Sequence, residues 1–257
     1  KLADIIHSNP LVVAIPNMMY PEPGYDKFKN DNSNRDMVTY FGSNEGILHA
    51  VRMATSVSNV YTLDDKATEL WAFIPNAVLP MLSKTTDQLH DYMVDGLFRA
   101  IDIKTTTGNV YKTVLLGEMR SGGQSLFALD ITDPRNPNLM WEVNPTTNPN
   151  EFVKIGKTWS SGAIGRLCES TPCDYHSSTN RWVAILGSRP AHPPLSACTI
   201  WMESPGRRRQ AMSNTCSPFT KKRMCGRILS CSSIIRNLRP GYRRSRWVSN
   251  SASVAPV

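Results

Sequence analysis

A four-part order of segments repeats along the first 188 residues, and this repetition constrains the fold more than any single motif does. Each unit opens with a short apolar segment, which is followed by a hydrophobic strand that ends in glycine. A glycine-bearing turn then leads to another strand, and a last strand carries a tryptophan. The opening segments are "HSNPLVVAI" at 7–15, "VDGLFRAIDI" at 94–103 and "WSSGAIGRL" at 159–167, which begins with Trp159.

The glycines and tryptophans of these units have structural roles in this interpretation. The strand-ending glycines are Gly42, Gly117 and Gly187, the turn glycines are Gly46 and Gly123, and the strand tryptophans are Trp71 and Trp141. Glycine ends a strand or permits positive φ in a hairpin. Tryptophan is a large flat side chain that suits packing between sheets.

Four strands per unit, repeated in series, predict an all-β fold. We expect residues 1–188 to form a partial β-propeller of about three four-stranded antiparallel blades. A β-sandwich with coincidental similarity is the alternative. Propeller repeats commonly run to about 40–50 residues, and the units here are longer. We therefore expect inserted loops at Tyr20–Arg35 and Pro75–Tyr92.

The same segments, in the same order, resemble the C-terminal propeller domain of the PilC/PilY family of type IV pilus biogenesis and tip-adhesin proteins. The matching stretches are "DIIHSNPLVV", "YFGSNEGILHAV", "ELWAFIPNAVLP", "YMVDG", "TVLLGEMRSGGQSLFALDITDP" and "GKTWSSGAIGRL". Blades with glycine turns and tryptophans also occur in quinoprotein dehydrogenases. The resemblance therefore depends on the whole set in order and covers residues 1–188.

The resemblance implies a non-catalytic module that supports pilus biogenesis and surface attachment. It implies a location at the cell surface or pilus tip of a Gram-negative bacterium, after export through the periplasm and outer membrane. The implied partners are minor pilins of the type IV pilus and a host or abiotic surface. The family's intact domain also implies calcium, bound by a loop of spaced Asp and Asn residues.

That calcium loop is not found in this sequence. A hard cation needs several oxygen ligands at alternate positions. Asp64 and Asp65 are adjacent, and Asp130 and Asp133 are three apart with prolines nearby. We expect both pairs to form Asx-turns in hairpins. The chain is therefore expected to hold no metal and no cofactor.

Catalytic motifs are equally absent from the sequence. The five histidines show no metal-ligand spacing: His7, His49, His90, His176 and His192. His49 lies in a predicted strand and is expected to be packed. A quinoprotein dehydrogenase fragment is the rival interpretation, but its catalytic Asp and adjacent cysteines are not visible. No run of about 18 apolar residues predicts a membrane span.

The loop "CESTPC" places Cys168 and Cys173 five residues apart. The family's location implies an oxidising compartment, and there we expect a local disulfide between these two cysteines. Two free thiols in a flexible loop are the alternative. A zinc site would need two more ligands nearby, and His176 is the one close candidate.

The composition changes sharply near Ser188. Residues 189–257 hold eleven Arg, two Lys and one acid, Glu203, whereas residues 1–188 hold 16 basic and 20 acidic residues. Stretches such as "GRRRQ" and "YRRSR" have the charge of a nucleic-acid-binding arm. However, no strand or helix period accompanies them, so we expect a poorly structured tail and no nucleic-acid binding.

Translation in the wrong frame explains this tail better. Regrouping the single-codon residues Trp201 and Met202 with Glu203 gives Asp-Gly, which is a turn signal. The net charge of +8 would then be an artefact of the tail. We also expect the incomplete propeller to be unstable, with Trp182, Val183, Ile185 and Leu186 on an exposed end face.

Overall fold

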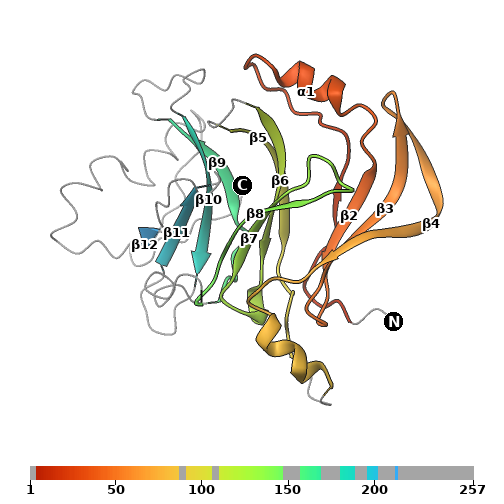
Figure 1. Cartoon of the computed structure of the whole chain (residues 1–257). Coiled ribbons are helices and arrows are strands. Elements are labelled where there is room, and N and C mark those ends of the chain that lie inside the picture. Colours follow the sequence, from red (N-terminus) through yellow and green to blue (C-terminus); the bar gives the residue numbers. More distant parts are fainter. Residues whose placement is uncertain are drawn as a thin grey trace, which may run out of the picture.

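Three four-stranded antiparallel sheets stand side by side in the structure, which is a computed structural model (Figure 1). The structure describes residues 4–86, 91–105, 110–146, 157–168, 180–188, 196–201 and 212–213. Each sheet keeps its strands in chain order, so each is an up-and-down blade. This arrangement confirms the predicted stack of antiparallel blades.

The first sheet contains β1 (Leu11–Val13), β2 (Met37–Gly42), β3 (Leu48–Val57) and β4 (Val60–Phe73). Burial alternates along β2, as the period of two of a strand requires. The β3–β4 hairpin projects beyond the other strands (Figure 1). Ser58 and Asn59 form its tip with φ of 50° and 67°, the backbone of a type I′ turn.

The second sheet contains β5 (Phe98–Lys104), β6 (Tyr111–Glu118), β7 (Leu126–Asp130) and β8 (Asn138–Val143). Strands β6 and β7 are buried along almost their whole length, because a sheet lies against each of their faces. The 3₁₀ helix η2 (Arg120–Gly122) lies in the turn between them.

The third sheet contains β9 (Ala163–Leu167), β10 (Arg181–Ser188), β11 (Ser196–Trp201) and β12 (Met212–Ser213). Its last two strands lie beyond residue 188 and pair in series with β10. The rest of the predicted tail lies outside the described residues. The division at residue 188 and the out-of-frame origin of the tail therefore stay predictions.

Apolar side chains join the three sheets into one stack. Val38, Tyr40 and Leu48 pack against Leu115 and Phe127 between the first and second sheets. On the other side of the second sheet, a separate cluster meets the third sheet, and its buried members are Ile103, Val114, Leu116, Leu126, Ala128, Trp182 and Ala184. Each fully buried Val or Leu contributes roughly 1.5–3 kcal/mol.

The expectation that Trp182 lies on an exposed end face is wrong. Trp182 is 7% exposed, and Val183 is fully buried. Trp182 belongs to the cluster between the second and third sheets. Because side chains alternate between the faces of a strand, a tryptophan in β10 can equally face inward, and only the register of the sheets decides which face is covered.

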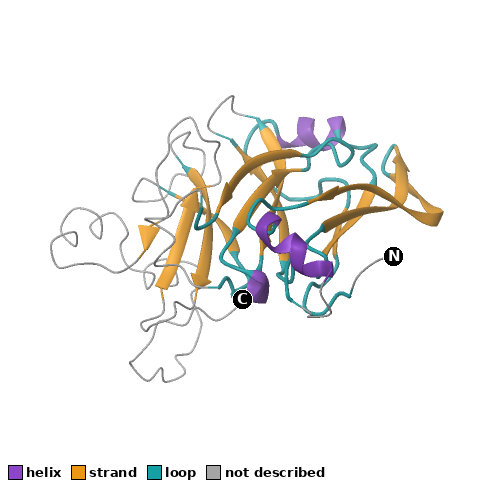
Figure 2. Cartoon of the chain, turned by 60° about the horizontal axis from the view of Figure 1, so that its bottom comes forward, coloured by secondary structure: helices purple, strands orange, loops and turns teal. Residues whose placement is uncertain are grey.

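The two expected insertions carry the two longer helical segments (Figure 2). The insertion at Tyr20–Arg35 contains α1 (Tyr25–Asp31), and the insertion at Pro75–Tyr92 contains the 3₁₀ helix η1 (Leu79–Thr86). Among the described residues, no helix is both long and apolar enough to cross a bilayer.

The first insertion is a strap from the first sheet over the second. The Tyr25 hydroxyl donates to Asp102 Oδ2 at 2.6 Å, and the Tyr20 hydroxyl donates to the Asp102 carbonyl at 2.8 Å. Tyr20 also meets the Trp182 ring edge to face, with centroids 6.0 Å apart. The strap therefore touches all three sheets.

Candidate interaction site on the first sheet

The outer face of the first sheet corresponds to a face that is covered in the second sheet. In each sheet, the second and third strands are joined by a turn. The residue pair next to that turn is Gly42 with Leu48 in the first sheet and Glu118 with Leu126 in the second. Counted from these pairs, His49 corresponds to Phe127. Phe127 packs between the first and second sheets, whereas no described sheet covers His49.

This count also shows that two of the predicted glycines are not equivalent. Gly42 belongs to the last pair before its turn, whereas Gly117 pairs one step earlier, with Phe127. At Gly42 an added Cβ would lie 2.1 Å from the Val94 carbonyl oxygen, so the incoming chain of the second sheet needs that space. At Gly117 the Phe127 ring lies in the place of the Cβ.

His49 is held between two carboxylates at this outer face. Its Nδ1 lies 2.6 Å from Glu69 Oε1, and its Nε2 lies 3.1 Å from Glu45 Oε1. The Phe41 ring stacks on the imidazole, with centroids 5.1 Å apart. The His49 side chain is 8% exposed, whereas that of Glu69 is 51% exposed. The carboxylates are thus reachable from solvent while the imidazole is fixed.

A groove of about 680 Å³ lies over this group. Its lining residues are Thr39, Phe41, Glu45, Ile47, His49, Val51, Met53, Ala67, Glu69 and Ala72. The groove combines apolar walls with two carboxylates. Such a surface suits contact with another protein surface, because an apolar patch rimmed by polar groups is typical of interaction sites.

The contacts of His49 also have the connectivity of a Ser-His-acid triad, because Ser43 Oγ lies 3.1 Å from His49 Nε2. Ser43 is only 1% exposed, however. Its backbone is tied into the turn, since its N–H donates to the Ile47 carbonyl and its carbonyl accepts from Gly46. A nucleophile must reach a substrate carbonyl, so this burial favours a structural role for the hydroxyl.

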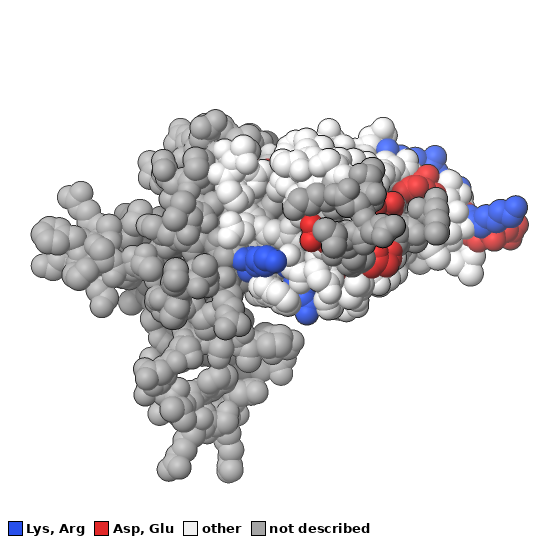
Figure 3. Space-filling view, turned by 90° about the horizontal axis from the view of Figure 1, so that it is seen from below, with Lys and Arg blue, Asp and Glu red and all other residues white. Residues whose placement is uncertain are grey.

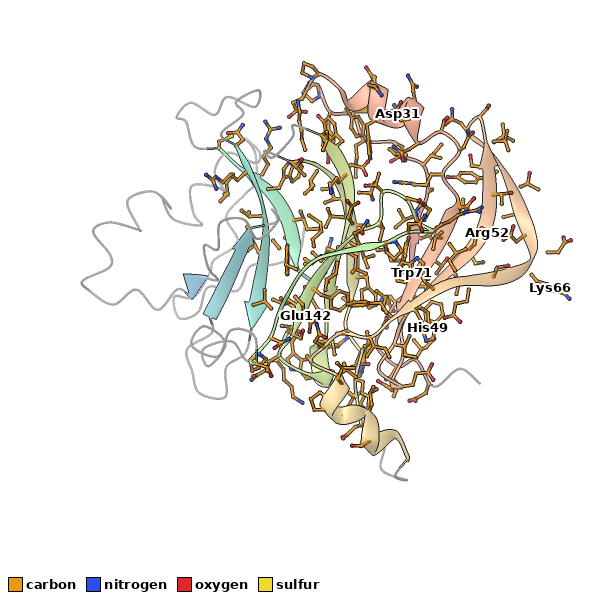
Figure 4. The ribbon with its side chains drawn as sticks, in the orientation of Figure 1. Asp31, His49, Arg52, Lys66, Trp71 and Glu142 are labelled. Carbon is orange, nitrogen blue, oxygen red and sulfur yellow. The ribbon has the colours of Figure 1, made fainter. Side chains whose placement is uncertain are left out.

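The remaining residues predicted to shape the blades lie where strands turn or meet. Gly46 adopts φ of 91°, which favours glycine. Gly123 follows η2, and Gly187 pairs with Ala197 near the end of β10. Trp71 Nε1 donates to the Pro134 carbonyl of the second sheet at 2.8 Å (Figure 4), and Trp141 packs toward the third sheet.

Trp159 differs from the other predicted blade residues, because 49% of it is exposed. It stacks against the Arg120 guanidinium, whose central carbon lies 5.3 Å from the ring centroid.

The carboxylates of Asp130 and Asp133 have partners within their own turn and sheet. Asp130 Oδ1 accepts from Thr132 and its Oδ2 accepts from Lys112, while Asp133 Oδ1 accepts from the Arg135 N–H. These are Asx-turns, as expected. No group of three or more His, Cys, Asp or Glu side chains that could hold a metal ion occurs in the part of the chain that the structure describes, and the lack of a calcium loop stays a prediction.

Asp64 corrects one detail of that prediction. It lies within β4 and not in a turn, and its Oδ2 accepts from Arg52 Nε on β3 at 2.7 Å. A cross-strand ion pair therefore occupies this carboxylate. The turn itself is formed by Ser58 and Asn59, because the hairpin is longer than the sequence pattern indicated.

Cys168 is disulfide-bonded. Cys173, its expected partner, lies outside the described residues, as do His90, His176 and His192, so the pairing stays a prediction. His7 Nδ1 lies 2.8 Å from Asp95 Oδ2, which joins the segment before β1 to the one before β5.

Sequence reasoning identified His49 as packed but missed Glu45, Glu69 and Glu118. Glu45 lies four residues before His49 in a turn, and no sequence period brings Glu69 to the same face. Glu118 is 2% exposed and accepts from the Gly162 N–H of the chain entering the third sheet. Burial raises the pKa of Glu118 to about 8.

Comparison with known proteins places these sheets in a family. The profile of the PilY1 beta-propeller domain matches residues 2–171. The type IV pilus biogenesis factor PilY1 homolog of Xylella fastidiosa is 33% identical over 198 residues, covering 74% of this chain and 14% of the relative. PilY1 of Pseudomonas aeruginosa strain UCBPP-PA14 is 32% identical over 199 residues, covering 73% of this chain and 15% of the relative.

A solved structure agrees with these matches. The crystal structure of the Pseudomonas aeruginosa PilY1 C-terminal domain superposes with a TM-score of 0.51 at 27% identity, covering 76% of this chain and 33% of that chain. The chain thus spans a small part of the relatives that it matches. Its stacked four-stranded sheets and its family profile together show that the chain belongs to the PilY1 beta-propeller domain family of type IV pilus biogenesis factors.

Proposed function

We propose that the chain is part of a propeller that serves as a non-catalytic binding module in type IV pilus biogenesis and surface attachment. Its partners in this proposal are minor pilins and a host or abiotic surface, at the pilus tip or cell surface of a Gram-negative bacterium. The relatives' names support pilus biogenesis. The observation that carries the binding role is the open groove on the first sheet.

The groove supports binding and not turnover. Its one triad-like hydroxyl, on Ser43, is buried beneath the turn. Its carboxylates on Glu45 and Glu69 hold His49 and leave the apolar walls available for contact. The proposal includes no cofactor for this chain, and calcium for the intact family domain alone.

A segment exchange tests the proposal. Residues 4–146 of this chain replace the matching segment of PilY1 in Pseudomonas aeruginosa, and surface pili and twitching motility are measured. We expect both to be retained. A second exchange carries Val51→Asp, which puts a third carboxylate into the groove, and we expect it to reduce piliation at an unchanged level of exported protein.

Loss of pili with the unaltered segment, despite normal export and a normal melting temperature of the purified domain, would contradict the proposal. The quinoprotein alternative has its own test, in which the purified chain is titrated with pyrroloquinoline quinone and assayed for dye-linked alcohol oxidation. Saturable quinone binding with turnover would favour that alternative.

A further inference from the structure

A second surface of the molecule gathers an exposed tryptophan and two cations. Trp159 is the most exposed of the tryptophans whose side chains the structure describes, at 49%. The Arg120 guanidinium covers one side of its ring. Lys157 Nζ donates to the carbonyl of Ser121, the next residue after Arg120, at 2.8 Å. Arg120 and Lys157 thus both lie at the η2 turn, where Trp159 packs on Arg120 and Lys157 bonds to the neighbouring Ser121 carbonyl.

The backbone of Arg120 is held in an unfavourable conformation at this point. Its φ is 49°, in the left-handed region where a residue with a side chain is strained and glycine is not. The N–H groups of Met119 and Arg120 both donate to Thr158 Oγ1, at 3.1 and 3.2 Å. Thr158 is 1% exposed, so the turn is fixed by a buried contact.

Arg120 thus occupies a backbone conformation that glycine would adopt at lower free energy. Two glycines, Gly122 and Gly123, follow in the same turn, so the turn already contains residues that adopt unusual backbone angles easily. Arg120 Nε is buried with no hydrogen-bond partner. The guanidinium is thus pre-organised against Trp159 without being needed to satisfy a polar group of the fold.

Neither Arg120 nor Lys157 has a carboxylate partner among the described residues. Within the part of the chain that the structure describes, no carboxylate forms an ion pair with Arg120 or Lys157. Helix η1 lies at the lower end of the stack (Figure 1), and the η2 turn approaches the segment after η1, because Gly122 packs against the Met93 carbonyl. From below, acidic side chains lie over the middle and right of the described surface, where basic side chains also lie, and two further basic groups lie on its left (Figure 3).

Two features select the class of ligand. Tryptophan and arginine are the residues most enriched among the energetic anchors of protein interfaces, and an arginine fork binds a carboxylate through paired hydrogen bonds. A nucleic acid needs many phosphate contacts, whereas residues 1–188 carry more acids than bases. A ligand with a carboxylate next to an apolar side chain fits this surface. The carboxylate can bind the cations, and the apolar side chain can pack on the exposed part of the Trp159 ring.

We propose that Arg120, Trp159 and Lys157 form a docking site for an acidic protein segment, in which a Glu or Asp carboxylate binds Arg120 and a neighbouring apolar side chain packs on Trp159. Lys157 adds attraction at longer range. This surface shares no residue with the groove on the first sheet.

The test titrates the full chain with the labelled peptide Ac-Gly-Leu-Glu-Leu-Glu-Gly-NH2 and follows fluorescence anisotropy. We expect saturable binding that weakens with added salt and falls at least about tenfold when both Glu are replaced by Gln. The decisive variant is Arg120→Gly. It should keep or raise the melting temperature, because glycine relieves the strained φ, and it should lose about tenfold in affinity.

Trp159→Ala should weaken binding similarly, and Lys157→Gln about threefold. Lys27→Gln on α1 is the matched control, because it removes an exposed lysine from a different element, the strap. It should leave the peptide affinity unchanged. Equal binding of the Glu and Gln peptides, an unchanged affinity in Arg120→Gly, or a lower melting temperature in that variant would overturn the site. Tighter binding of a single-stranded oligothymidylate, as a nucleic acid, or of tetragalacturonate, as an acidic sugar, than of the acidic peptide would also overturn the site.

Discussion

At the scale of single residues, the close approach of two chains at Gly42 is a sensitive point. An added Cβ there would lie 2.1 Å from the Val94 carbonyl oxygen, which is backbone and cannot swing away. Gly42→Ala should therefore lower the free energy of unfolding by about 1–3 kcal/mol. Gly165→Ala in β9 is the control, because nothing lies within 4 Å of its added Cβ.

Urea unfolding of both variants, followed by circular dichroism, checks this prediction. Equal stability of Gly42→Ala and Gly165→Ala would show that the segment before β5 can shift away from β2.

Glu118 makes stability depend on pH. Its folded pKa of about 8 lies above the ordinary value of 4.5, and burial is the main cause. The stability that the neutral carboxyl contributes is fully present below pH 4.5 and is lost as the pH rises toward 8. The loss is at most about 1.4 kcal/mol per pH unit. Glu118→Gln should remove this slope, because glutamine stays neutral and can still accept from Gly162.

Thermal melts between pH 5 and 8.5 measure this effect, with the exposed Asp26→Asn on α1 as a control. A slope that is the same in the native chain and in Glu118→Gln would mean that Glu118 is ionised in the fold.

At the scale of elements, the strap between β1 and β2 is fastened by Asp102. Its two carboxylate oxygens accept from Tyr25 and Thr113, both at 2.6 Å. Arg35, at the other end of the strap, donates to the Thr113 hydroxyl at 2.6 Å. The strap is thus held to the second sheet by one buried polar network, and such networks weaken when one member is removed.

Tyr25→Phe keeps the ring of this network and deletes the hydroxyl. It should lower stability by about 1–2 kcal/mol and make α1 cleavable by trypsin at Lys27 or Lys29. Lys27→Asn is the control for stability, because its exposed ion pair with Asp31 is worth little. Limited proteolysis with mass spectrometry reads out the strap, and unchanged cleavage in Tyr25→Phe would show that its apolar contacts suffice.

At the scale of the whole molecule, the open outer face of the first sheet should govern association. The β3–β4 hairpin leaves Met53 40%, Val57 70% and Val60 68% exposed. Exposed apolar strands promote edge and face contacts between chains. We expect residues 1–188, expressed alone, to be oligomeric or insoluble, and Met53→Thr with Val57→Thr to shift the soluble fraction toward monomer.

Size-exclusion chromatography with light scattering measures this shift. Trp182→Ser should instead unfold the third sheet, because Trp182 is buried between two sheets. A monodisperse native monomer that melts cooperatively would show that the outer face does not drive association.

The sequence by itself determined the strands, their antiparallel order and the family. Alternation of buried residues in "MVTYFG", the glycine turn at Gly46 and the order of the segments are local or sequential properties, and the fold follows them. Strand propensity and turn chemistry act over a few residues, so a single sequence can display them.

Only the tertiary structure decided which side chains share a face. Gly42 and Gly117 look equivalent in sequence but pair one step apart. Glu69 reaches His49 from a strand whose pairing shifts at two bulges, and Trp182 faces inward while Trp159 faces outward. The physical reason is that a one-residue change of register moves every side chain to the opposite face of a sheet, and that register is set by packing between sheets far apart in the chain.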